Sequence, residues 1–374
     1  MIGVLCTSYP RGPDDPAGAF VRTRVRALAA AGQSVEIIAA GLGGEGSEQK
    51  VRVFRIPTLG AAEIFYAGGA PEALEGGASG WRARAWLEAG HFTARMAGLA
   101  AQRAVGWSAV ESHWLLPSAL VACAVLPHLH HRAHAHGGDV FLLARLSGGA
   151  SLARLLCRSG PELVFASADL RERFARLCGD APETLGARTS VQPAPYDSLL
   201  FRPRPAGERP GLRDRFGLTR FTVLAAGRLV SIKGFDVLVR AVGHLPAEAR
   251  PTLVIGGAGP EEPRLRRLAA ACAVDLRLVG LLSPATLADW MTAADLFVHP
   301  CRSLPNGRSE GAPVVVREAL AAGMSVVASA VGGLPELGGH PRLTLIRPEN
   351  PSALAVQIGL TMASRHEAAR QDEC

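Results

Sequence analysis

The sequence predicts an α/β protein of two doubly wound domains, and three observations indicate this. The chain opens with a short apolar run over residues 2–6, a polar loop, a helical pattern that stops at Gly32, and a second apolar run over 34–40. This order of strand, loop, helix and strand is typical of nucleotide-binding α/β domains. A comparable order begins again at Phe221. Between the two lies a linker of turn-forming residues, Pro203, Pro205, Gly207 and Pro210.

Length and composition limit the class of protein. At 374 residues the chain has room for two domains of ordinary size, which we assign to residues 1–205 and 206–374. A hydrophobic content of 48% with 20% charged residues indicates a globular protein. The net charge of +7 is spread over both halves, so neither half looks like a nucleic-acid-binding domain. Anionic small molecules or an anionic membrane surface fit this balance. No signal segment opens the chain, so we expect a cytoplasmic protein.

Lysine and cysteine usage adds two hints. Lys50 and Lys233 are the only lysines among 40 basic residues. In a chain that uses arginine almost everywhere, Lys233 suggests a need for a compact ammonium group, although chance remains an alternative explanation. The seven cysteines contain no CxxC pair, which favours reduced thiols over a metal site.

The remainder of the first half gives a third strand, a long helical region and a histidine-rich run. Residues 51–56 are predicted to form the strand. From Leu59 to Ala104 the chain is glycine-rich and then helical, with basic and aromatic residues interleaved between Trp81 and Met96. Two interpretations stay open: a helix that contacts a membrane surface or an acceptor, and a helix with one packed and one solvated face. The histidine-rich run over 128–136 lacks acidic or cysteine partners at ligand spacing, so we predict no metal site.

The second half begins with a strand that ends at Gly227. Arg228 and Lys233 follow on the loop before a helix that contains Leu238. Two cations beside a helix N-terminus make a preorganised anion site. Two further units of strand, turn and helix follow, and the second of these helices begins at Ser283.

The stretch from residue 310 to 336 is the most informative part of the chain. Glu310 is expected on a loop, and Glu318 within a helix that begins near Pro313 and ends before Gly323. A buried strand and a second glycine-rich turn are expected next. A carboxylate can accept two hydrogen bonds from the vicinal hydroxyls of a sugar or a ribose. For either glutamate alone, a solvated position or a helix-dipole contact is the simpler interpretation.

The whole of this stretch resembles the C-terminal motif of the retaining glycosyltransferases of family 4. That family pairs two glutamates at this spacing and continues with EA-x-A-x-G and GG-x-PE, which are residues 318–323 and 332–336 here. Residues 111–122 and 135–143 are similar to N-domain segments of exopolysaccharide and lipopolysaccharide glycosyltransferases. Near residue 197 the family has a Gly-Val-Asp turn. This chain keeps the aspartate, as Asp197, but has Ala194 or Pro195 in place of the glycine.

The resemblance implies the GT-B fold, in which two Rossmann-like domains face a cleft, and it implies roles for individual residues. Arg228 and Lys233 would stabilise the departing diphosphate without a metal ion or cofactor. Glu310 would hold the sugar hydroxyls, His136 would face the sugar, and Glu318 would hold the ribose. The further donor-binding positions implied are Gly18, Gly257, Gly259, Leu282, Gly311 and Val314.

The activity implied is transfer of a hexose, with retention, from a UDP- or GDP-sugar to a hydroxyl of a saccharide or lipid-linked acceptor. This would serve cell-surface polysaccharide or glycolipid synthesis, in the cytoplasm or at the inner face of the membrane, with no nucleic-acid partner. Two alternatives stay open. One is an epimerase or hydrolase of nucleotide-sugars on the same scaffold. The other is a non-catalytic partner subunit, which the altered turn at Asp197 and a C-terminus short for the family favour.

Overall fold

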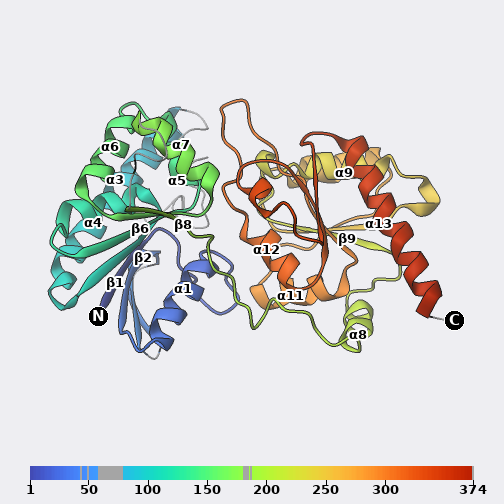
Figure 1. Ribbon diagram of the computed structural model, residues 1–374, viewed down its shortest axis with the longest axis horizontal. Helices are drawn as coiled ribbons and strands as arrows, with labels where there is room; N and C mark the ends of the chain where they lie inside the picture. The colour runs from blue at the N-terminus through green and yellow to red at the C-terminus, as the bar shows by residue number, and fades with distance from the viewer. Residues whose placement is uncertain (43, 49, 58–78, 180–184, 186–187, 373–374) are drawn as a thin grey trace. The chain divides into compact units, whose positions relative to one another are not determined.

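The computed structural model describes the whole chain except residues 43, 49, 58–78, 180–184, 186–187 and 373–374 (Figure 1). It divides into two compact units, Met1–Pro195 and Tyr196–Cys374. Residues 196–205, which the sequence analysis placed in the first domain, group with unit 2. The reason is that Tyr196, Leu200 and Phe201 pack into the hydrophobic core of that unit.

Unit 1 is built on one sheet of eight described strands in the order β3-β4-β2-β1-β5-β6-β7-β8. Neighbouring strands are parallel except β3 and β4. The sequential order reverses at β1, where Ile2 pairs with Val35 on one side and with Ala109 on the other. The strands are β1 Ile2–Cys6, β2 Val35–Gly41, β3 Gly44–Glu48, β4 Val51–Pro57, β5 Ala109–His113, β6 His130–Ala135, β7 Glu162–Phe165 and β8 Thr189–Val191.

Helices cover both faces of this sheet, as the alternation along the strands requires. Ile37 and Ala39 of β2 pack with Val21 and Val25 of one helix, whereas Ile38 faces the opposite core under a long helix. A strand buried on both faces by helices is typical of parallel sheets. The helices are α1 Ala19–Ala30, α3 Ser79–Arg103, α4 Leu120–Val125, α5 Gly138–Arg145, α6 Gly149–Ser159 and α7 Ala168–Cys178 (Figure 1).

Unit 2 has six described strands, all parallel, in the order β11-β10-β9-β12-β13-β14. The order reverses between β9 and β12, and ligands of doubly wound sheets bind at such a point, outside the carboxyl ends of the strands. The strands are β9 Thr222–Ala226, β10 Thr252–Gly256, β11 Leu276–Leu278, β12 Leu296–His299, β13 Ser325–Ser329 and β14 Leu343–Ile346.

The helices of unit 2 also lie on both faces of their sheet. Val223 and Ala225 of β9 belong to the core formed with α9, α10 and α13, whereas Leu224 and Ala226 belong to the core formed with α11 and α12. The helices are α8 Glu208–Arg215, α9 Phe235–Gly243, α10 Glu262–Ala271, α11 Pro284–Ala293, α12 Val314–Ala321 and α13 Pro351–Asp372. The predicted pair of doubly wound domains is confirmed.

A search of the described residues for membrane-spanning segments finds no helix with the length and apolar character needed to cross a bilayer.

Candidate functional site

The charged residues predicted for the donor site of unit 2 gather beyond the carboxyl ends of β9 and β12. Lys233 ends a short 3₁₀ turn, Ser231–Lys233, between β9 and α9. Glu310 lies on the loop between β12 and α12, as predicted. Lys233 Nζ is 2.7 Å from Glu310 Oε1, and each side chain is 14% exposed. The structure therefore brings these two residues together at the point where the strand order reverses.

Electrostatics keep Glu310 ionised. Burial opposes its ionisation, but the charges of Lys233, of His299 once that residue is protonated in acid, and of Arg228 outweigh burial and lower the pKa of Glu310 to about 2. Arg228 follows β9 directly and is close enough to act on this carboxylate. The result is an ionised carboxylate and two cations at one end of the sheet, which suits a ligand that carries both hydroxyl and phosphate groups.

His299 is a member of this cluster that the sequence analysis missed. It is the last residue of β12 and is fully buried. Neither of its ring nitrogens has a hydrogen-bond partner among the described residues. Burial and, secondly, the charge of Lys233 lower its pKa to about 3, so the imidazole is neutral at neutral pH. The available signal was a polar residue at the end of an otherwise apolar strand.

The glycines predicted to bind the donor lie in a turn that is tied to the loop of Arg228. Gly257 and Gly259 follow β10. The amide of Leu229 donates to the carbonyl of Ala258 over 2.9 Å, and Glu261 donates back to the carbonyl of Leu229 over 3.0 Å. Because the two turns share these bonds, the loop that carries Arg228 is held by the turn after β10 as well as by its own strand.

The glycine pair after β13 supports the loop of Glu310. Gly332 has φ of 55°, and a β-carbon there would lie 1.7 Å from the carbonyl oxygen of Glu310. The amide of Gly333 donates to the carbonyl of Gly311 over 2.7 Å. Only glycine permits this approach and this backbone angle together. The start and the end of the motif, residues 310–311 and 332–333, are therefore in direct backbone contact.

Glu318 differs from Glu310 in its surroundings. It lies within α12, which begins at Val314 as the sequence predicted. Burial raises the pKa of Glu318 to about 7, and the neighbouring Arg317 opposes this shift only partly. Leu282, the predicted base-contacting position, lies against Gly256 at the end of β10. Leu282 thus lies at the carboxyl end of β10.

In unit 1, Gly18 lies two residues before Phe20, and the ring of Phe20 contacts the ring of His136. Gly18 has φ of 74° directly before α1, and a β-carbon there would lie 2.4 Å from the carbonyl oxygen of Ser8. The rings of Phe20 and His136 have centroids 4.6 Å apart. His136 follows β6, and burial, with His134 as the second cause, lowers its pKa well below the usual value.

A buried carboxylate fixes the turn that carries His136. Asp139 accepts hydrogen bonds from the backbone amides of Gly137 and Val140, and also from Leu115 on another segment. Burial raises the pKa of Asp139 despite these bonds. Asp139 is thus a structural anchor for the histidine.

Comparisons with known proteins agree with this geometry. Residues 220–363 match the family described as "Glycosyl transferases group 1". A GDP-mannose-dependent alpha-(1-6)-phosphatidylinositol monomannoside mannosyltransferase of Mycobacterium tuberculosis is 36% identical over 62% of this chain and 59% of its own length. The protein of the same name from Mycolicibacterium smegmatis is 31% identical over 72% of this chain and 71% of its own length. The sucrose-phosphate synthase of Thermosynechococcus elongatus superposes with a TM-score of 0.70 at 21% identity, covering 97% of this chain and 90% of that one.

The matched family region begins just before β9 and includes Lys233, Glu310 and Glu318. The match to the Mycobacterium tuberculosis protein spans less than two thirds of that protein's length, whereas the Mycolicibacterium smegmatis match spans more. The structural likeness establishes the two-domain GT-B fold. The chain therefore belongs to the glycosyl transferases group 1 family.

Proposed function

We propose that the protein transfers a sugar from a nucleotide diphosphate-sugar to a hydroxyl acceptor, with retention at the anomeric carbon. The observation that carries this proposal is the pair of Lys233 and Glu310, 2.7 Å apart, with Arg228 acting on the same carboxylate. The cluster lies at the strand reversal of unit 2, where a doubly wound sheet binds its ligand. Membership of a glycosyltransferase family supports the same activity.

The two cations are assigned to the leaving group. As the bond between the sugar and the diphosphate breaks, negative charge grows on the diphosphate oxygens. Lys233 and Arg228 interact more strongly with that charge than with the ground state, and such a difference accelerates the reaction. The proposal therefore gives these side chains the role that a divalent metal has in other phosphate sites.

The carboxylates and the histidine are assigned to the sugar and the ribose. Glu310 is ionised and accepts hydrogen bonds from sugar hydroxyls, and Glu318 accepts them from the ribose. Backbone groups near Leu282 contact the base. In unit 1, His136 contacts the transferred sugar.

The relatives suggest the donor to test first. Both relatives are named as GDP-mannose-dependent mannosyltransferases, and both names include phosphatidylinositol monomannoside. We therefore propose a GDP-sugar ahead of a UDP-sugar, and a saccharide or lipid-linked acceptor reached at the inner face of the membrane by peripheral attachment.

A thermal-shift screen of nucleotides tests the donor site. GDP-mannose, UDP-glucose and their free diphosphates are added at increasing concentration in the presence of a chelator, with Lys233→Ala as the control variant. A ligand that binds only the folded state stabilises it by roughly 2.7 kcal/mol at a hundred times its dissociation constant. We expect at least one nucleotide-sugar and its free diphosphate to raise the melting temperature of the wild type and to do so less in the variant.

Three results would contradict parts of the proposal. A shift that requires magnesium would remove the cation-only mechanism. If no nucleotide shifts the transition, a non-catalytic partner subunit explains the chain better. If a donor binds but the product is not a glycoside with retained anomeric configuration, the proposed retaining transfer is wrong, and an epimerase or hydrolase is the alternative.

A further inference from the structure

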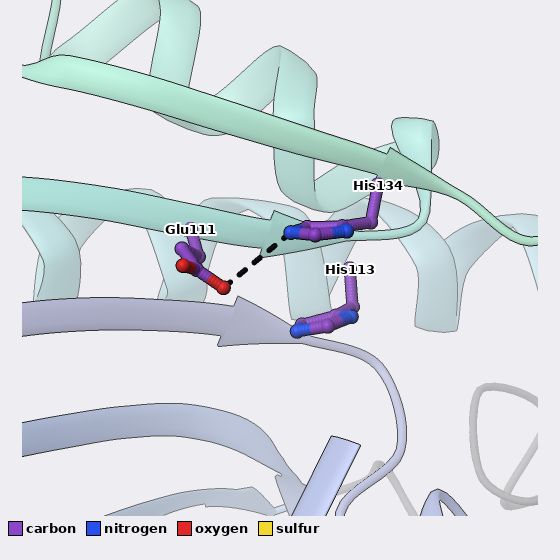
Figure 2. A group of neighbouring side chains, drawn as sticks. All are labelled: Glu111, His113 and His134. Carbon is purple, nitrogen blue, oxygen red and sulfur yellow. Dashed lines mark ion pairs between the residues drawn. The ribbon is translucent and has the colours of Figure 1, made fainter. Parts of the chain in front are cut away.

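We propose that Glu111, His113 and His134 form a binding site for a divalent transition-metal ion of the zinc type in unit 1. Glu111 and His113 lie on β5, and His134 lies on the neighbouring strand β6, where it pairs directly with His113. One potential ligand atom from each of the three lies within 4.8 Å of the others. Figure 2 shows the two imidazole rings stacked, each with a nitrogen at the edge nearest the carboxylate.

Both histidines are buried, and among the described residues the only partner of their candidate ligand atoms is the Glu111 carboxylate, which forms an ion pair with His134 Nε2. His113 is 2% exposed and His134 is 8% exposed. Within the described part of the chain, Nε2 of His113 and Nε2 of His134 make no hydrogen bond. A buried polar atom without a hydrogen bond is costly, so the Nε2 atom of His113, close to the pair of His134 and Glu111, points to a ligand that all three side chains share.

The spacing requires little movement. In tetrahedral zinc sites with bonds of about 2.0–2.1 Å, neighbouring ligand atoms are about 3.4 Å apart. His134 Nε2 already lies 3.4 Å from Glu111 Oε2. The ring of His113 is stacked on that of His134, with centroids 4.7 Å apart and an interplanar angle of 11°. A small rotation of the His113 side chain would direct its Nε2 to the point between the other two.

Outer contacts hold two of these ligands in place. Arg24 of α1 donates from Nη2 to Glu111 Oε1 over 2.5 Å and from Nε to Oε2 over 3.0 Å. A metal on Oε2 leaves the bond to Oε1 intact. Nδ1 of His113 lies 3.0 Å from Nε2 of His136. Second-shell bonds of this kind orient metal ligands in known sites.

Arg24 also limits the affinity. Its charge lies beside the proposed ion and opposes a second cation. We therefore expect binding weaker than at a structural zinc site.

The site has an entrance and room for a further ligand. A cavity of about 130 Å³ in unit 1 is lined by His113, His134 and His136 together with Arg24. It admits water as a fourth ligand, and three protein ligands with one open position are the usual arrangement of non-structural zinc sites.

The donor set selects the metal. Two imidazoles and one carboxylate suit Zn²⁺ and related first-row ions, whereas Mg²⁺ and Ca²⁺ prefer oxygen ligands. This proposal concerns a zinc-type ion in unit 1. It is separate from the proposal that the donor site of unit 2 works without magnesium. A metal on Nε2 of His113 also places the proton on Nδ1, so that His113 donates to His136 and fixes the tautomer of that residue.

Metal binding is measured directly, on the full chain without a polyhistidine tag and without nucleotide. Zn²⁺ stoichiometry is determined by equilibrium dialysis and metal analysis for the wild type, Glu111→Gln and His134→Gln. The matched control is His130→Gln, which removes an exposed histidine from the same strand and leaves the three ligands in place. Circular dichroism confirms that each variant is folded. We expect about one bound Zn²⁺ fewer in the two ligand variants than in the wild type and the control.

A second measurement identifies the ligands. Co²⁺ added in place of Zn²⁺ should give the visible absorption of a four- or five-coordinate ion, without the near-ultraviolet band of cobalt bound to thiolate. Equal Zn²⁺ binding in all four proteins, or a thiolate band, would overturn the proposal, since the metal would then be bound elsewhere. Because no nucleotide is present, these results do not depend on the proposed transferase activity.

Discussion

Lys233 is the residue whose removal gives the most specific prediction. We expect Lys233→Ala to lower kcat by roughly a hundredfold to a thousandfold, as for loss of one preorganised electrostatic contact. The melting temperature should also fall, because Glu310 is 14% exposed and loses its ion-pair partner. Steady-state kinetics and a thermal melt measure the two effects.

A double variant separates the two effects of this change. Adding Glu310→Gln to Lys233→Ala should restore part of the melting temperature, because no unpaired carboxylate remains. It should not restore the rate. Recovery of activity in the double variant would show that Lys233 serves only to neutralise Glu310.

The raised pKa of Glu318 leads us to expect that donor binding depends on pH. Its pKa is raised to about 7, so the protonated form gains population as the pH falls through 7. If ribose hydroxyls bind the ionised form, the affinity for a nucleotide-sugar is full well above pH 7 and falls up to tenfold for each unit below it. Calorimetric titration from pH 6 to 8.5 measures this, with a nucleotide-sugar rather than a free diphosphate, because the terminal phosphate of the latter titrates near pH 6.

The matched variant for this prediction is Glu318→Gln. It should bind the donor more weakly at high pH and show no titration between pH 6 and 8.5. The assignment to the ribose would be wrong if the wild type and the variant gave the same affinity across this range.

Residues of the site were predictable where their motif is continuous and not where distant strands meet. Glu310 and Glu318 share one stretch of motif with the glycine pair that supports the loop of Glu310. Glu111 and His134, by contrast, belong to no such motif, and only the pairing of β5 with β6 brings them together. The histidine run was judged to lack an acidic partner because that partner comes from the adjacent strand.

At the scale of elements, α3 has the packed face that one interpretation predicted, and its contact with a membrane stays a prediction. Phe92 and Met96 are fully buried, so one face packs on the sheet. The opposite face exposes Trp86 and Leu87, at 48% and 69%, next to exposed Arg84. The side chains of Trp81 and Arg82, and the glycine-rich segment before the helix, lie outside the described residues. The exposed face retains the apolar and basic character expected of a helix on a membrane surface.

This exposed face predicts attachment to anionic lipid. We expect the protein to sediment with vesicles that contain anionic phospholipid at low salt and to be released as salt is raised, because salt screens basic contacts. The double variant Trp86→Ser/Leu87→Ser should bind less. Val105→Ser, at another exposed apolar position of unit 1, is the control. Equal sedimentation of all three proteins would remove α3 from the proposed contact.

One element that sequence analysis missed is β3. Its five residues, GEGSE, contain no apolar side chain, so neither periodicity nor β-propensity marks it. It forms because β4 offers an unpaired edge, against which it runs antiparallel. Backbone pairing at a sheet edge needs no hydrophobic pattern. By contrast, β1, β2 and β4 each contain an apolar run, and the sequence analysis predicted all three.

For the whole molecule, two buried carboxylates predict how stability depends on acid. Burial opposes ionisation of Glu111, yet His134 and Arg24 lower its pKa to about 2, and Glu310 in unit 2 has a similar value. Both folded-state values lie below the usual value of 4.5. Their stabilisation is therefore fully present above about pH 4.5 and is lost as the pH falls from there towards 2.

Glu111→Gln tests this dependence. At pH 7 the variant should be less stable by roughly 3 kcal/mol, an order-of-magnitude value from the size of the pKa shift. The difference in the free energy of unfolding should shrink steadily between pH 4.5 and 3, as measured by denaturant titration. A difference that stays constant with pH would mean that the variant acts through packing and not through the charge of Glu111.

Because the chain contains only two lysines, Lys50 and Lys233, acylation of lysine can report on the candidate donor site. Apart from the α-amino group, an acylating reagent finds only the exposed Lys50 and the enclosed Lys233. The ammonium of Lys233 is engaged by Glu310 at 2.7 Å, so it reacts more slowly than that of Lys50. In the proposed function, a bound diphosphate would cover it further. Mass spectrometry of the two labelled peptides thus reports occupancy of the site in an unmodified sequence, with Lys50 as the internal standard.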